Sequence, residues 1–267
     1  MKTMAKIYTA LVFIFLYAPI AVLILFSFNS TNSTGVFEGF SLYWYKELFS
    51  NSGALNALKN TLILATLSAV IATVIGTAAA TGIVKFRRKA IKNTVLSVTN
   101  IPMMNPDIVT GISLMLLFVF IGRLIGIQTS YLNFWTLLIA HVTFNIPYVI
   151  LNVMPKFSQM DVHLPEAAMD LGCTPVKVMT KVILPLSASG IISGVTMVLV
   201  PSISTFYISQ KLGGGTFELI GDTIERQFVT GALNTGAALS LVMMILILLS
   251  LAVMNRFTDS DEGGIIV

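Results

Sequence analysis

Asp107 is the residue whose position in this sequence most directly suggests chemistry. It lies in PDIVTGISL (106–114), at the start of a long apolar run. A carboxylate inside a bilayer costs roughly 2.5–3.5 kcal/mol, so it should face protein or a water-filled path. There it could offset the desolvation of a positively charged solute. The alternative is a helix-start residue, because an acid that follows a proline suits a helix N-terminus.

The stretch EAAMDLGCTPVKVMTKVILPL (166–186) carries acids and bases between two apolar runs. Pro165 and Glu166 favour the first turn of a short helix. Gly172 suits the left-handed position that ends a helix, and Thr174 with Pro175 favours the start of another. The sequence therefore predicts a short helix, a tight turn and a second helix that leads toward Pro185.

Catalytic patterns are absent from the sequence. It contains no phosphate-binding G-x-x-x-x-G-K-[ST], no H-E-x-x-H and no pair of cysteines. Gly213 to Gly215 are followed by Thr216 and Phe217, which favours a turn. We expect His141 to be packed or hydrogen-bonded within a span and His163 to be solvated. The sequence thus predicts no enzyme activity, no metal site and no cofactor bound by this chain.

The composition indicates an integral membrane protein. Of 267 residues, 55% are hydrophobic and only 10% are charged, against roughly 25% charged in globular proteins. Hydropathy predicts an all-α protein with six spans, since each run is near the roughly 20 residues that cross a bilayer. We expect one transmembrane domain over 1–267, with spans at about 7–28, 60–84, 102–122, 134–154, 184–206 and 237–255.

Basic residues predict the orientation of these spans. With a cytoplasmic N-terminus, the inner segments hold eleven Lys and Arg residues and the outer segments hold five. The positive-inside rule therefore predicts that both termini are cytoplasmic. The cluster KFRRKAIK (85–92) dominates this bias, either as a topology anchor or as a lipid-binding segment. The net charge of +4 then reflects orientation, and no nucleic-acid partner is expected.

This orientation places a hairpin at about 155–183 inside the cell and two longer loops, about 29–59 and 207–236, outside. The second loop should hold an amphipathic helix over 216–229, with Glu218, Asp222 and Glu225 toward water. Within the hairpin, Ala167, Ala168 and Leu171 share an apolar face. The pattern alone fits either a hairpin on the bilayer surface or a docking element for another protein.

Glu166-Ala167-Ala168, then Gly172, then Leu184-Pro185 resembles the EAA motif of ABC-importer permeases. Val182 departs mildly from that motif, which prefers Ile there. The resemblance implies that the hairpin is a coupling helix that docks on an ATPase subunit. The residues that the resemblance assigns to coupling are Glu166, Ala167, Ala168, Asp170, Leu171 and Gly172.

Three further stretches resemble spermidine/putrescine-type permeases: FEGFSLYWYKELFSN (37–51), 106–114 and ISQKLGGGTFELIGDTIERQF (208–228). The resemblance places Asp107 and Trp44 on a substrate pathway, where an aromatic ring could contact a cation; Trp44 could equally be an interfacial anchor. Many such permeases carry an acidic pair, as in S-x-D-D-F, at the end of the fifth span. Here Ser204 and Thr205 stand where the carboxylates would be, so the partner permease supplies the charge or the solute is less cationic.

The resemblance implies a subunit of a type I ABC importer in a bacterial inner membrane. The expected partners are two cytoplasmic ATP-binding subunits that hold ATP and Mg²⁺, a second and different permease, an extracytoplasmic solute-binding protein and the lipid bilayer. A polyamine is the expected solute, with ferric iron and thiamine as alternatives. A self-sufficient secondary transporter is the alternative from another class, although the sequence shows no internal repeat typical of one.

Overall fold

The computed structural model describes residues 2–33, 35–86, 88–126, 132–161, 163–215 and 217–262. Within these ranges every regular element is a helix, apart from one isolated antiparallel bridge between Asn29 and Phe40. The helices are α1 (Lys2–Ser27), α2 (Tyr43–Ser50), α3 (Ser52–Val84), α4 (Lys89–Met104), α5 (Asp107–Leu124), α6 (Phe134–Gln159), α7 (Leu164–Asp170), α8 (Pro175–Val178), the π-helix η1 (Met179–Ile183), α9 (Leu184–Leu186), α10 (Ala188–Ser204), α11 (Tyr207–Leu212), α12 (Ile220–Val229) and α13 (Leu233–Glu262).

Five of the described helices are long and apolar enough to cross a membrane: Met4–Ser27 of α1, all of α3, α5 and α6, and Leu233–Arg256 of α13. A sixth span forms if the pair Pro175–Leu186 and Ala188–Ser204, bent by 71°, crosses as one unit. An all-helical membrane protein follows from the bilayer itself, because a helix satisfies its own backbone hydrogen bonds. The predicted fold class is confirmed.

The predicted start of the third span is wrong. Residues 102–122 do not form one helix, because α4 ends at Met104 and α5 begins at Asp107. Asn105 has φ −78° and ψ 138°, the extended conformation that a following proline favours. Pro106 therefore breaks the helix, whereas Pro102 is accommodated inside α4.

Other predicted boundaries also shift. Helix α6 continues through Pro155 to Gln159, so the hairpin begins at Met160 rather than near 155. The fifth span breaks at Ser187, and its straight part begins at Ala188. The two segments that were predicted to lie outside are shorter than predicted, because α3 starts at Ser52 and α13 starts at Leu233.

Helices α3, α6 and α10 form the core. Leu64, Leu137, Val149, Val153 and Val198 are fully buried in it. Helix α3 contributes a buried face of small residues at intervals of three and four, namely Ala65, Ala69, Ala72, Gly76 and Ala80. Small residues let helix backbones approach closely where lipid offers no hydrophobic driving force. The core is therefore assembled by close helix packing.

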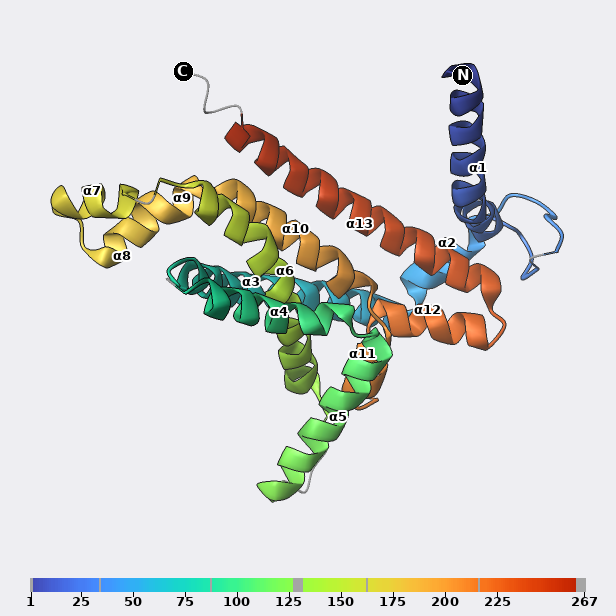
Figure 1. The fold of residues 1–267 in the computed structure, drawn as a ribbon. Helices are drawn as coiled ribbons and strands as arrows, with labels where there is room; N and C mark the ends of the chain where they lie inside the picture. The colour runs from blue at the N-terminus through green and yellow to red at the C-terminus, as the bar shows by residue number, and fades with distance from the viewer. Residues whose placement is uncertain are drawn as a thin grey trace.

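Figure 1 shows the two ends of this bundle. Helices α7 and α8 lie at one end, and α2 and α12 lie near the other. Helix α5 projects from the bundle and packs on α11, while α1 contacts α13 and projects from it at a steep angle. Both projecting helices expose large apolar side chains, such as Phe15 of α1 and Phe120 of α5. The predicted hairpin and the predicted outer loops are thus at opposite ends.

A close approach of α3 to α6 at Gly76 yields the first prediction. A Cβ added at Gly76 would lie 2.7 Å from the Cβ of Val149, whereas one at Gly82, also in α3, would meet nothing within 4 Å. We expect Gly76→Ala to destabilise the protein by about 1–3 kcal/mol, because overpacking strains a close-packed core. Gly82→Ala should be neutral or stabilising, because alanine favours helix. Thermal midpoints in detergent compare the two, and equal midpoints would contradict the packing described.

Candidate functional site

Helix α7 is the first arm of the hairpin. Pro165 occupies its first turn together with Glu166, as the sequence predicts. Its end is a Schellman turn, in which Gly172 N–H donates to Met169 O at 2.8 Å and Cys173 N–H donates to Ala168 O at 3.1 Å. Gly172 has φ +83°, a conformation that glycine adopts without a steric penalty. The predicted glycine turn is confirmed.

The second arm also begins as predicted. The Thr174 hydroxyl accepts a hydrogen bond from Lys177 N–H at 3.4 Å, and Pro175 is the first helical residue. Helix α8 then runs through η1 into α9. Such π-helical segments are rare and occur mostly as short interruptions of α-helices. The second arm is therefore one nearly continuous helix that reaches α10 across the bend at Ser187.

The hairpin presents its residues outward. The Glu166 side chain is 71% exposed, and its contact is an interaction of Oε2 with His163 Nδ1 at 3.3 Å. Leu171 is 87% exposed. Ala167, Asp170 and Gly172 are also exposed, and Ala168 is half-buried. Exposed apolar side chains next to a carboxylate form a surface that another protein can cover.

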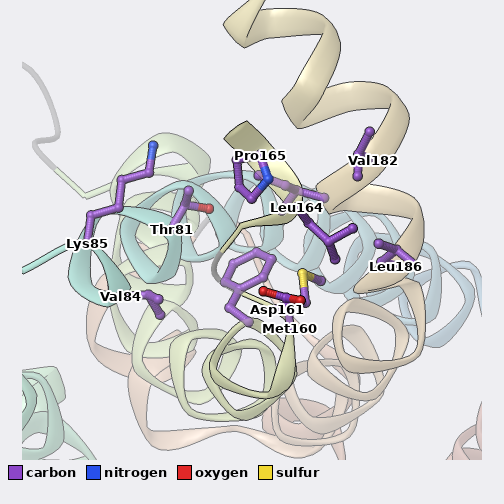
Figure 2. A pocket seen from close by; sticks show the side chains of 11 residues that line it. Thr81, Val84, Lys85, Met160, Asp161, Leu164, Pro165, Val182 and Leu186 are labelled. Atoms are coloured by element: carbon purple, nitrogen blue, oxygen red, sulfur yellow. The ribbon is translucent and has the colours of Figure 1, made fainter. Parts of the chain in front are cut away.

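A largely apolar cavity of about 280 Å³ lies beneath the hairpin (Figure 2). Its lining comes from the end of α3, the end of α6 and both arms of the hairpin, and includes Lys85, Asp161, Leu164, Pro165 and Val182. The hairpin is thus joined to the bundle across a partly empty space. A displacement of the hairpin breaks fewer close contacts there than it would in a packed core.

A second cavity, of about 310 Å³, brings together three of the four residues assigned to the substrate pathway. Asp107, Ser204 and Thr205 line it, although they come from the start of α5 and the end of α10. The rest of the lining is supplied by α6, α10 and α11, namely His141, Phe144, Asn145, Tyr148, Pro201, Ser202, Phe206, Tyr207 and Ile208. Asp107 is the one carboxylate in this lining, and no Lys or Arg belongs to it.

Asp107 fits both interpretations of the sequence, as a residue that starts a helix and as a carboxylate that faces a path for solute. It is the first residue of α5, where the helix dipole favours a negative charge. It also faces the cavity, and its side chain is exposed on this chain. Within the described residues its carboxylate makes no hydrogen bond or ion pair. The carboxylate is therefore available to a ligand.

Helix α6 contributes four cavity residues that the sequence did not assign to the site, and three of them are polar or carry a polar group. His141, Asn145 and Tyr148 are spaced i, i+4 and i+7, which places them on one helical face. His141 is packed and hydrogen-bonded as predicted, with Nδ1 2.9 Å from Leu137 O. The periodic spacing of polar residues in an apolar helix is the signal that could have identified this face.

Trp44 lies outside this cavity. Its Nε1–H donates to Asn29 O at 2.7 Å, and its ring meets Tyr43 edge-on. It lines a separate cavity of about 280 Å³ between α2, α12 and the start of α13, together with Glu47 and Arg226. The indole therefore ties α2 to the segment that follows α1, at the end of the bundle opposite the hairpin.

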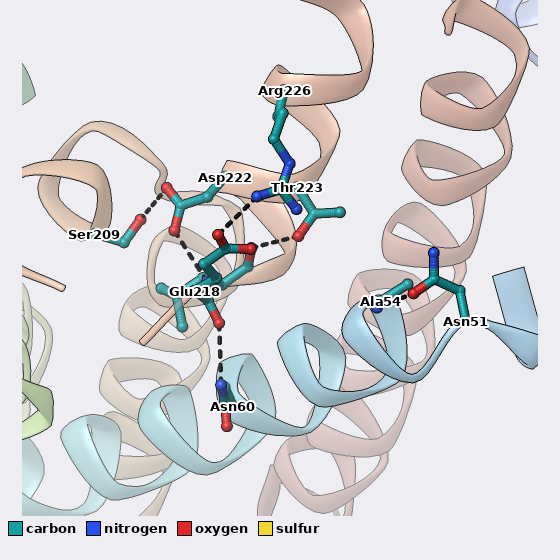
Figure 3. A network of polar contacts seen from close by, with 9 residues as sticks. Asn51, Ala54, Asn60, Ser209, Glu218, Asp222, Thr223 and Arg226 are labelled. Atoms are coloured by element: carbon teal, nitrogen blue, oxygen red, sulfur yellow. Dashed lines mark hydrogen bonds and ion pairs between the residues drawn. The ribbon is translucent and has the colours of Figure 1, made fainter. Parts of the chain in front are cut away.

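The predicted outer amphipathic helix exists as α12, but one acid does not face water (Figure 3). Asp222 accepts hydrogen bonds from Leu219 N–H at 2.9 Å and from Ser209 Oγ–H at 2.7 Å. Burial raises the pKa of the Asp222 carboxyl, while these two hydrogen bonds act in the opposite direction. Arg226 donates to Glu218 at 2.7 Å. Asp222 thus ties α11 to the start of α12.

The described chain combines an all-helical membrane fold, an exposed hairpin at one end and a polar cavity away from it, an arrangement that suits a transport permease. The family described as binding-protein-dependent transport system inner membrane component matches residues 72–260. The chain belongs to this family. It is therefore a multi-pass inner-membrane protein and a transport subunit.

Several curated proteins are similar in sequence to most of this chain. The spermidine/putrescine transport system permease protein PotC of Shigella flexneri is 32% identical over 95% of this chain and 94% of its own length. PotC of Haemophilus influenzae is 33% identical over 94% of this chain and 95% of its own length. The putrescine transport system permease protein PotI of Escherichia coli K12 is 36% identical over 76% of this chain and 72% of its own length.

Solved structures share the fold. A chain of a bacterial ABC transporter involved in the import of the acidic polysaccharide alginate superposes with a TM-score of 0.76 and 18% identity, covering 97% of this chain and 95% of that one. A chain of the MetNI methionine ABC transporter superposes with a TM-score of 0.59 and 17% identity, covering 78% of this chain and 95% of that one. At these identities the likeness supports the architecture alone.

Asp222 yields the second prediction. Asp222→Ala removes the acceptor of the Leu219 N–H and leaves the Ser209 hydroxyl with Phe206 O alone, and we expect a loss of about 1–3 kcal/mol. Glu225→Ala, on the same helix, is the matched control, because the described chain offers the Glu225 side chain no hydrogen bond. Thermal unfolding of the purified variants measures the difference. A midpoint for Asp222→Ala as high as that of the control would show that the contact is unimportant.

Proposed function

We propose that this chain is a permease subunit of an ATP-driven ABC importer of polyamines such as spermidine and putrescine. The observation that carries the proposal is the cavity that Asp107 shares with Ser204 and Thr205, in which the one formal charge is negative. Polyamines carry several ammonium groups, and a carboxylate on their path offsets the desolvation of those groups. The names of the PotC and PotI relatives support the same solute class.

The exposed hairpin supports the proposed partners. We assign Glu166, Ala167, Ala168, Asp170, Leu171 and Gly172 to docking on a cytoplasmic ATPase, of which two copies would bind ATP and Mg²⁺. The apolar faces of α1 and α5 leave room for a second permease, proposed to be a different chain, and for lipid. An extracytoplasmic binding protein would deliver the solute at the end that carries α2 and α12.

This arrangement requires both termini and the hairpin to be cytoplasmic. Trp44 would then lie at the outer entrance, where its ring can meet a cation before the solute reaches Asp107. Closure of the ATPases would displace the hairpin and open the pathway outward. Hydrolysis would return it inward, so that solute leaves on the cytoplasmic side. The hydroxyl groups of Ser204 and Thr205 complete the polar wall along this path.

The third prediction tests the pathway. We expect Asp107→Asn to lower spermidine uptake at least tenfold in cells that depend on this importer, because the substitution removes the charge that faces the ammonium group. Glu225→Gln, which removes a carboxylate from α12, should retain uptake. Copurification of the ATPase confirms assembly in both cases. Wild-type uptake by Asp107→Asn would assign Asp107 to helix stabilisation only.

The fourth prediction tests coupling. Glu166→Lys reverses a charge on the exposed face of α7, so we expect the protein to insert in the membrane but to lose ATPase copurification and uptake. Glu38→Lys makes the same change on the exposed first outer segment and should keep the ATPase bound. An ATPase that copurifies equally with both variants, together with retained uptake, would contradict the docking role.

A further inference from the structure

Two buried hydrogen-bond acceptors on α6 lack a donor. Nε2 of His141 and Oδ1 of Asn145 have no hydrogen-bond partner in the described chain, although the two residues are only 2% and 1% exposed. Both residues line the cavity that contains Asp107. A buried polar atom without a partner costs about 1–3 kcal/mol. Such atoms in a native protein call for an explanation, and a ligand is one.

The surroundings of Asn145 determine which of its side-chain atoms is unpaired. Its Nδ2 donates to Ser202 Oγ at 2.8 Å and to Ser68 Oγ at 3.4 Å. The Ser202 hydroxyl donates to Val198 O and the Ser68 hydroxyl to Ala65 O. Because each serine proton is already used, both serine oxygens can only accept, and the amide nitrogen of Asn145 must point at them. Oδ1 is therefore the atom left as a free acceptor.

The tautomer of His141 is determined in the same way. Its Nδ1 lies 2.9 Å from the carbonyl oxygen of Leu137. A carbonyl oxygen only accepts, so Nδ1 carries the proton of the neutral ring. Nε2 then holds a lone pair and is an acceptor. Thr205 adds a third unpaired atom to the same lining, because its buried Oγ1 has no partner among the described residues.

The groups that line the cavity indicate which kind of ligand could pair with the unpaired acceptors. Asp107 offers a negative charge, and His141 and Asn145 offer neutral acceptors within one cavity. A primary ammonium group carries one positive charge and three N–H donors, and it needs an acceptor for each donor when it leaves water. An anion or a carbonyl-rich solute would leave these acceptors unpaired.

We propose, resting on the proposed function, that His141 Nε2 and Asn145 Oδ1 form an acceptor subsite that receives the N–H groups of a primary ammonium whose charge faces Asp107. The subsite selects for N–H donors, whereas Asp107 selects for charge. Methylation of the amine removes donors and keeps the charge, so it separates the two contributions. The assembled importer should therefore prefer a primary amine to its methylated analogue.

The test uses the complete transporter in proteoliposomes with saturating binding protein. Uptake of spermidine is compared with uptake of an analogue that is dimethylated at both terminal amines, which keeps the charge and leaves one N–H at each end. The ratio of the two rates is measured for wild type and for Asn145→Leu. Discrimination by the binding protein is common to both proteins and cancels when the ratios are compared.

We expect Asn145→Leu to lower the spermidine-to-analogue ratio at least about tenfold, the scale of one hydrogen bond to a charged group. Asn152→Leu is the matched control on the same helix. Asn152 Nδ2 donates to Tyr148 O and its Oδ1 accepts from Ser193, so its polar atoms are paired within the protein. The control should keep the wild-type ratio. A ratio unchanged in Asn145→Leu, with both rates lowered alike, would show a purely structural asparagine and overturn the proposal.

His141 gives an independent pair of variants if Asn145→Leu fails to assemble. His141→Phe removes the acceptor and should lower the ratio, whereas His141→Gln restores a side-chain oxygen and should recover it. Equal ratios in the two variants would overturn the subsite. If the wild-type complex transports neither amine, the proposed function fails instead. If the wild type transports spermidine and the variants keep the wild-type ratio, the subsite proposal is wrong, but the proposed polyamine import is still supported.

Discussion

The hydrogen-bonded contact of Asn145 with Ser68 and Ser202 is the interaction on which the rest of the structure depends. It joins α3, α6 and α10 inside an apolar core, through a side chain that is almost completely buried. Polar pairs of this kind are costly to leave unmade where water is absent. The contact fixes the level at which the three helices pack and leaves one acceptor beside the cavity. Asn145 thus joins the core helices and is also the residue proposed to receive the solute.

Helices α6 and α10 connect the two sites. Helix α6 contributes cavity residues from its middle and α10 contributes them from its C-terminal end, and the hairpin joins the end of α6 to the start of α10. In the proposed mechanism, α6 and α10 carry a displacement of the hairpin toward the cavity, because the two helices pack against one another. The partly empty space beneath the hairpin favours that proposed displacement, and the bend at Ser187 is its proposed hinge. The proposed partner ATPases would act on the cavity through this connection.

Local rules predicted the hairpin well, because Pro165, Gly172 and Thr174 act on their own backbone. They predicted the break at Pro106 poorly, since a proline can end a helix or be accommodated within it, as Pro102 is. The sequence placed Asp107, Ser204 and Thr205 on a common path only through resemblance. Their meeting in one cavity depends on how α5, α10 and α11 pack. The roles of His141 and Asn145 depend on which atoms their neighbours leave unpaired, and this is a tertiary property.

The coupling of the hairpin to the cavity is most directly tested by cysteine accessibility. Cys173 is the single cysteine of the chain, so Cys173→Ala with Ser204→Cys carries one thiol, in the cavity. In the assembled transporter, a membrane-impermeant thiol reagent is applied from the outside, with the ATPases at rest or trapped with nucleotide and vanadate. The account predicts rapid labelling in the trapped state, slow labelling at rest, and loss of this difference when Glu166→Lys is added. Labelling that is independent of nucleotide in the otherwise wild-type complex would contradict it.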